Sequence, residues 1–169
     1  MFSIEEIRIT AAPYVQLVNK FGEKYQLRGM VTADHLGYKC ASKESYERLR
    51  TLFEQESNYI YQSIISNRRI SIICLREPIV TSLGSVSCLE LSDQKPDGSQ
   101  KEGFDHIEIF PSFCTFEELV TAIQNSGERG ERSVKPHHTT HNFRLAPEFL
   151  LKIEPCALIE KIKNEEMTI

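Results

Sequence analysis

Hydrophobic positions along this chain follow first a helical spacing and then strand alternation. From residue 4 to about residue 22 they recur at helical spacing, and Pro13 predicts a break or a restart within that helix. Alternating apolar residues predict a strand from Thr32 to Cys40. Ser42 follows as the N-cap of a second, amphipathic helix. Three runs with strand character come next, at residues 59–65, 70–76 and 84–91.

A polar segment at residues 92–103 separates this pattern from a second one. It holds Pro, Gly, Ser and charged residues and almost nothing apolar, which is typical of a linker. After it we predict a strand at residues 104–110 and a helix capped by Thr115, because Glu118 completes a capping box. The rest of the chain predicts extended structure at 134–145, a strand at 148–154 and an amphipathic closing helix at 156–166.

The order of these elements occurs twice, which indicates an internal duplication of a βαβββ module. We therefore predict an α+β fold in which two such modules form one cupped mixed sheet. A helical leader precedes the modules and a helix closes the chain. The predicted boundaries are a leader at 1–30, a first module at 31–92, a linker at 93–103 and a second module with the closing helix at 104–169, all in one compact domain.

The composition excludes several classes of function. The 169 residues are 40% hydrophobic and 26% charged with a net charge of −4, so a basic nucleic-acid interface is not expected. No apolar run is long enough for a membrane span, and the N-terminus lacks a signal region. The five cysteines are scattered without a C-x-x-C pair, which favours reduced thiols in a cytoplasmic protein.

Each predicted module opens with an Asp-His pair and closes with a glutamate in an apolar strand. The histidines are His35 and His106, and the glutamates are Glu90 and Glu154. If equivalent module faces meet, these four side chains surround one point. Two imidazoles and two carboxylates suit a divalent Zn, Ni, Fe, Mn or Co ion. The alternative is a metal-free network in which each group hydrogen-bonds or pairs with Arg or Lys.

Neighbouring acidic residues extend this candidate site. Strand alternation places Glu108 on the face of His106, where it is a candidate ligand, a hydrogen-bond acceptor for a ligand or a substrate contact. The same alternation sends Asp34 and Asp105, which precede the two histidines, to the opposite face. We expect these two aspartates to form hydrogen bonds where the strands begin.

A histidine-rich stretch runs from Pro136 to Arg144. Its spacing fits no zinc finger and no HExxH motif, so we expect it at a pocket rim, with His141 as a candidate general base. Lys135 and Arg144 are candidates for holding a substrate carboxylate, and ordinary solvated charge is the alternative. The three histidines of this stretch are His137, His138 and His141.

Several segments resemble a known family. TADHLGYKC, LREP, CLEL, GFDHIEIF and IEPCALIEKI are similar, in this order and spacing, to segments of the YecM family of the vicinal oxygen chelate superfamily. That superfamily includes glyoxalase I, extradiol dioxygenases and bleomycin-resistance proteins. The resemblance spans roughly residues 31–163. It implies that the metal and the substrate lie inside the cup, with His35, Glu90, His106 and Glu154 as the metal ligands.

Three functions follow from the resemblance and from the alternative interpretation of the four polar residues. The first is a metal-dependent lyase, isomerase or dioxygenase that binds a small substrate through adjacent oxygens, with Glu90 or Glu154 moving a proton. The second is a small-molecule-binding protein without catalysis. The third is a metal-free structural or interaction protein, so the sequence leaves open whether the chain is an enzyme. A monomer and a homodimer are both compatible with the two modules.

Overall fold

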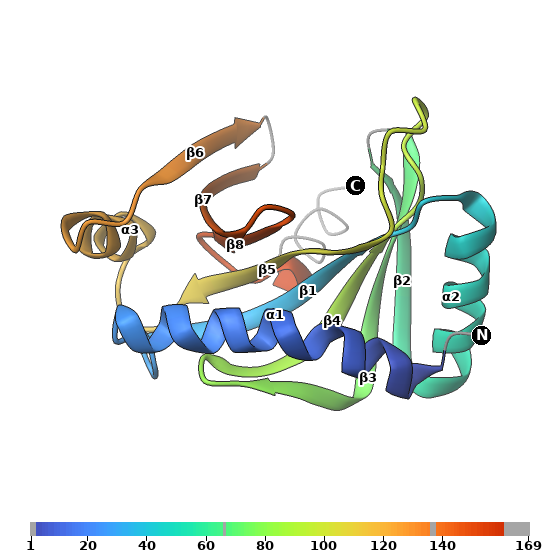
Figure 1. The fold of residues 1–169 in the computed structure, drawn as a ribbon, viewed down its shortest axis with the longest axis horizontal. Coiled ribbons are helices and arrows are strands. Elements are labelled where there is room, and N and C mark those ends of the chain that lie inside the picture. The colour runs from blue at the N-terminus through green and yellow to red at the C-terminus, as the bar shows by residue number, and fades with distance from the viewer. Residues whose placement is uncertain (1–2, 66, 136–137, 161–169) are drawn as a thin grey trace.

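A computed structural model describes residues 3–65, 67–135 and 138–160 of the chain. These residues form one mixed sheet of eight strands, with helices packed along it (Figure 1). The elements are α1 (Ile4–Lys24), β1 (Val31–Lys39), α2 (Lys43–Glu56), β2 (Ser57–Ile65), β3 (Arg68–Thr81), β4 (Gly84–Ser92), β5 (Gly103–Pro111), α3 (Phe116–Asn125), β6 (Gly130–Lys135), β7 (His138–Ala146) and β8 (Phe149–Ile153).

The sheet consists of two βαβββ modules placed side by side. The strand order is β2-β3-β4-β1-β5-β8-β7-β6, so the modules meet where β1 pairs with β5 in antiparallel orientation. Within the modules, β1 pairs with β4 and β5 pairs with β8, both in parallel. The predicted fold class is confirmed: the chain has the glyoxalase-like arrangement of two repeated modules in one open sheet.

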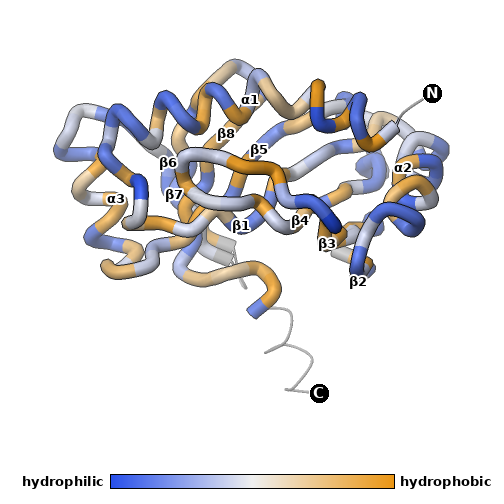
Figure 2. Tube along the Cα trace, turned by 90° about the horizontal axis from the view of Figure 1, so that it is seen from below, coloured by the Kyte–Doolittle hydropathy of each residue, from blue (hydrophilic) through white to orange (hydrophobic). Residues whose placement is uncertain are grey.

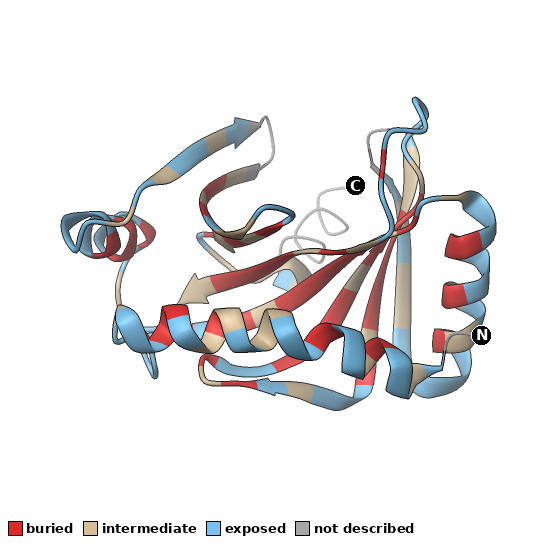
Figure 3. Cartoon of the chain, viewed as in Figure 1, coloured by how far each residue is buried: buried red, intermediate tan, exposed pale blue. Residues whose placement is uncertain are grey.

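One face of the sheet carries the helices and the main hydrophobic core. Buried residues of α1, α2 and α3 pack there against the central strands, and Leu36, Ile107 and Leu151 are among the strand residues that have no solvent contact. We call the opposite face of the sheet the inner face. The segment after β8 lies on the inner face, on the other side of the sheet from α1 (Figure 2). Burial is concentrated in the central strands, whereas β6 is largely exposed (Figure 3).

Several elements differ from the predicted ones. Pro13 does not interrupt α1, which continues to Lys24 with its apolar side on the sheet and its first turn closed by a capping box from Ser3. Strand β3 runs through Pro78 to Thr81 and is longer than expected. The polar middle of the second module forms two strands, β6 and β7. The closing helix predicted from residue 156 begins at residue 158, and residues 161–166 of that prediction lie outside the described residues. Among the residues that the structure describes, no helix is long and apolar enough to cross a membrane.

Candidate metal centre

The junction of the two modules brings His35 and His106 together on the inner face. Both imidazoles are buried, with 1% and 3% of their side chains exposed, and their Nε2 atoms are 3.4 Å apart. The rings meet edge to face at 85°, with 5.4 Å between their centroids. Residues far apart in sequence become neighbours because β1 and β5 pair here, with His35 opposite Glu108 and His106 opposite Gly37.

Gly37 is what lets the two rings approach one another. A Cβ atom at this position would lie 2.1 Å from Cε1 of His106 and 2.4 Å from its Nδ1. Such distances are far below van der Waals contact, so any side chain at residue 37 would push the imidazole away from His35. The glycine is therefore required for space, not for an unusual backbone angle.

Carboxylates surround the facing Nε2 atoms. Oε2 of Glu90 is 3.8 Å from Nε2 of His35, and its other oxygen accepts a hydrogen bond from Ser92 at 3.1 Å. Glu108 is buried, and its two oxygens each face one ring. Oε2 is 3.6 Å from Nε2 of His35, and Oε1 is 3.6 Å from Nε2 of His106. Ligand atoms of His35, Glu90 and His106 all lie within 4.8 Å of one another, and this set can hold a metal ion. Asp34, His35 and Glu108 form a second such set.

Two β-bulges correct the expectation for the aspartates that precede the histidines. In β1, Ala33 and His35 pair with successive positions of β5, so Asp34 is an extra residue. In β5, Asp105 is extra in the same way. The prediction that both aspartates point away from the histidines is wrong, because a bulge interrupts strand alternation and re-aims a side chain. Each Asp carboxylate is 2.9 Å from Nδ1 of the histidine that follows it.

These Asp–His contacts orient both imidazoles. A proton on Nδ1 donates to the aspartate, which leaves the Nε2 lone pair directed at the other histidine, as in metal sites where a carboxylate positions a histidine ligand. Asp105 also pairs with Lys39 at 2.5 Å, and Asp34 accepts a hydrogen bond from the backbone of Leu158 at 3.0 Å. The Asp-His pair that occurs twice in the sequence was the signal for this role.

The electrostatics of the cluster favour positive charge. Burial lowers the pKa of His35, but the carboxylates of Glu108, Asp34 and Glu90 outweigh burial and raise that pKa above its ordinary value. Burial also raises the pKa of Asp105, but His106 and Lys39 hold this pKa well below its usual range. A cation at the Nε2 atoms would be stabilised by the same carboxylates.

Glu154 lies outside both three-residue sets among the described residues. It directly follows β8, its side chain is buried, and its backbone N–H donates to the carbonyl of Ile109 at 2.9 Å. Glu154 comes two residues after Lys152, which corresponds to about 7 Å along the direction of β8. Its role as the fourth ligand stays a prediction.

The strand register identifies a different counterpart for Glu90. Glu90 pairs with the residue two positions after His35. In the second module, Lys152 pairs with Glu108, which lies two positions after His106. Lys152 therefore occupies the place of Glu90 in the duplicated module, and its Nζ is 3.3 Å from Oε1 of Glu108. Sequence reasoning missed Lys152 because it treated the closing glutamates of the two modules, Glu90 and Glu154, as equivalent. The strand register makes Lys152 the equivalent of Glu90.

His141 faces away from this cluster. It is buried next to α3, where its Nε2 is 3.3 Å from Nε2 of Gln124. Its ring also packs on Phe143, which in turn contacts Phe21 of α1. Burial and the neighbouring Arg132 lower the pKa of His141. The structure thus places this histidine on the helical face, and does not bring it to the facing imidazoles as a general base would require.

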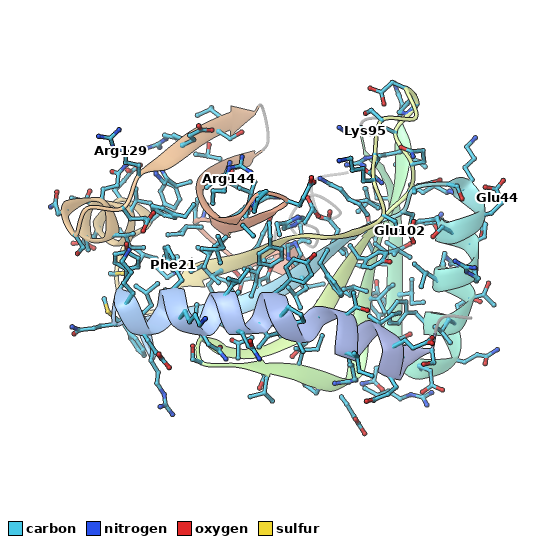
Figure 4. The ribbon with its side chains drawn as sticks, viewed as in Figure 1. Phe21, Glu44, Lys95, Glu102, Arg129 and Arg144 are labelled. Carbon is cyan, nitrogen blue, oxygen red and sulfur yellow. The ribbon has the colours of Figure 1, made fainter. Side chains whose placement is uncertain are left out.

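Of the other candidates in and next to the histidine-rich stretch, the structure describes the side chain of Arg144 alone. Arg144 is exposed on β7 and donates to the carbonyl of Pro147 at 2.8 Å (Figure 4). Lys135 and His138 pair at the end of β6 and the start of β7, and their side chains lie outside the described part. His137 lies outside the described residues altogether.

The fold and the cluster define a class: a two-module, glyoxalase-like protein with a buried His/Glu set that can hold a metal ion. The profile of a protein family, described as YecM protein, matches residues 4–163. The chain belongs to the YecM family.

Two individual proteins are similar to this chain. Protein YecM of Escherichia coli strain K12 is 29% identical over 111 residues, which span 63% of this chain and about 59% of that protein's length. A solved structure described as Structural Genomics, Protein EC4020 has 20% identity and a TM-score of 0.75, and the match covers 96% of this chain and 92% of that one. It supports the fold.

A more distant likeness is found to a methylmalonyl-CoA epimerase of Streptomyces coelicolor. The identity is 14% and the TM-score 0.46, over 76% of this chain and all of that one. At this level the likeness says nothing about the activity or the ligands of this chain.

Proposed function

We propose that this chain is a divalent-metal-binding protein whose ion lies between the Nε2 atoms of His35 and His106. The observation that supports this most is the paired orientation of the two imidazoles. Each Nδ1 is held by an aspartate, and the Nε2 atoms face one another at 3.4 Å. With Nδ1 of each ring occupied by an aspartate, the two Nε2 atoms are the ring nitrogens left to bind an ion.

The donor spacing fits one ion. Zn–N and Zn–O bonds of about 2.0–2.2 Å place adjacent ligand atoms roughly 3.0–3.5 Å apart. The two Nε2 atoms are 3.4 Å apart, within this range. Oxygens of Glu90 and Glu108 lie 3.8 Å and 3.6 Å from Nε2 of His35, so each would move inward by roughly 0.1–0.3 Å to bind the same ion. We assign His35, Glu90 and His106 as the ligands and Glu108 as the group that closes the set. Nitrogen and carboxylate donors suit Zn, Ni, Fe or Mn, and the identity stays open.

We propose that the centre acts on a small oxygenated molecule as a lyase, isomerase or dioxygenase. When bound, a divalent ion supplies Lewis-acid stabilisation of negative charge on oxygen. Glu108 and Glu90 are then the carboxylates positioned to accept or return a proton, because both lie within 4 Å of an imidazole Nε2.

Metal binding is tested on protein purified without chelators and then reconstituted with Zn²⁺, Ni²⁺, Mn²⁺ or Fe²⁺. We expect about one equivalent to remain after desalting and to raise the free energy of unfolding, by about 2.7 kcal/mol at a free metal concentration 100 times the Kd. Retention of less than about a tenth of an equivalent of every metal would contradict the proposal and favour a metal-free network. Metal binding without turnover of any oxygenated substrate would leave a small-molecule-binding protein.

A further inference from the structure

The two modules present different charges at equivalent positions of the metal centre. Register places Glu90 in the first module where the second module has Lys152. A strictly repeated site would put a carboxylate at both places. A lysine beside a bound cation weakens metal binding by charge repulsion, so its presence here indicates a task other than holding the ion.

Lys152 is also one of the groups that an arriving molecule meets first. Its side chain is 20% exposed and that of Glu90 is 21% exposed, whereas Glu108 is 5% exposed. Glu90 and Lys152 extend from the strands that flank the central β1–β5 pair, β4 and β8. A ligand entering the cluster therefore has a carboxylate on one side and an ammonium group on the other.

From this asymmetry we propose that the small oxygenated ligand of the proposed function is an organic acid whose carboxylate binds Lys152. Its anionic end turns toward Lys152 and away from Glu90, so the lysine selects the ligand and fixes its direction in the site. This inference rests on the proposed metal site and adds a ligand class to it.

The contact with Glu108 fits this role. The ammonium pairs with Glu108 at 3.3 Å, and Glu108 in turn faces both imidazoles. An incoming carboxylate replaces Glu108 as the partner of Lys152, and the freed Glu108 carboxylate is then available at 3.6 Å from His106. The rival explanation is that Lys152 only neutralises Glu108.

The test uses titration calorimetry on metal-loaded protein with oxalate and with catechol. Both probes offer vicinal oxygens, but catechol carries no carboxylate. We expect oxalate to bind, Lys152→Met to weaken oxalate binding by about tenfold or more, and Lys152→Arg to retain it within about threefold. Catechol binding should change less than about threefold in either variant. Lys101→Met is the matched control, because Lys101 is an exposed lysine that pairs with Glu148.

The outcomes separate this inference from the metal site itself. The metal content of each variant and of the unmodified chain is measured first. If the unmodified chain retains no metal, the proposed function itself is contradicted. If metal is retained but Lys152→Met leaves oxalate binding unchanged, or weakens oxalate and catechol equally, the lysine does not recognise a carboxylate. If Lys152→Met changes the metal affinity, and this change disappears in a Glu108→Gln background, Lys152 only neutralises Glu108. That result would overturn the inference.

Discussion

The two modules share a frame but differ in what they offer a ligand. Each supplies one histidine and one bulged aspartate to the centre, in equivalent positions. On the inner face of the first module, Ile70, Ile72 and Cys88 form an apolar cluster that is covered by Leu158 and Ile159. The second module instead presents Glu108 and Lys152 to the centre. Duplication thus explains the paired imidazoles, and divergence explains why the equivalent positions of Glu90 and Lys152 carry opposite charges.

The largest effect is expected from removing either histidine. His35→Ala and His106→Ala should each lower metal affinity by more than about 100-fold, because even the partners that orient metal ligands change affinity by about 10–100-fold. Equilibrium dialysis against a metal buffer measures this, with circular dichroism to check folding. A change of less than about threefold is expected for His141→Gln, the matched buried histidine on the helical face. Equal losses in all three variants would mean that folding, not ligation, is affected.

The two candidate fourth ligands can be ranked next. Glu108 faces both imidazoles. Glu154 lies two residues beyond Lys152, the residue of β8 that pairs with Glu108. We expect Glu108→Gln to lower metal affinity by about 10–100-fold and Glu154→Gln by less than about threefold. The reverse ranking, measured by the same dialysis, would restore Glu154 as the ligand and show that the second module follows the sequence-based pairing.

The position two residues after the histidine is a glycine, Gly37, in the first module and Glu108 in the second, and a methyl group at Gly37 tests this difference. Gly37→Ala should displace the His106 ring, destabilise the fold by about 1–3 kcal/mol and weaken metal binding. Urea unfolding of metal-free protein measures the first effect. In a His106→Ala background the same substitution should cost almost nothing, because the ring that it meets is absent. An undiminished cost there would place the clash elsewhere.

The smallest effect concerns the pH dependence of stability in the metal-free protein. The pKa of Asp105 is lower in the folded chain than the ordinary value of about 3.9. Its ionised form therefore stabilises the fold above about pH 4, and this contribution is lost as the pH falls below that value. The free energy of unfolding of Asp105→Asn should be lower than that of the unmodified chain at pH 6, and urea titrations should show this difference shrinking between about pH 4 and pH 2. A difference in the free energy of unfolding that does not change with pH would contradict this assignment.

The duplicated fold was readable from the sequence because its signals are local. Strand alternation, the caps at Ser42 and Thr115 and the polar segment before Gly103 each depend on a few neighbouring residues. The same patterns located His35, Glu90 and His106, since a repeated module brings equivalent positions together.

The rest depends on register, which the sequence does not fix. The bulges at Asp34 and Asp105 arise only when β1 pairs with β5, so strict alternation assigned both aspartates to the wrong face. The match between Glu90 and Lys152 likewise depends on how β8 pairs with β5. The space required at Gly37 comes from a ring that is distant in the sequence.

The most direct test is X-ray absorption spectroscopy of the Zn²⁺-loaded chain. Nitrogen and oxygen neighbours at about 2.0–2.1 Å, with the multiple-scattering pattern of two imidazoles that falls to one in His106→Ala, are the predicted result. Sulfur neighbours at about 2.3 Å, or a spectrum without imidazole, would contradict a centre formed by one histidine from each module.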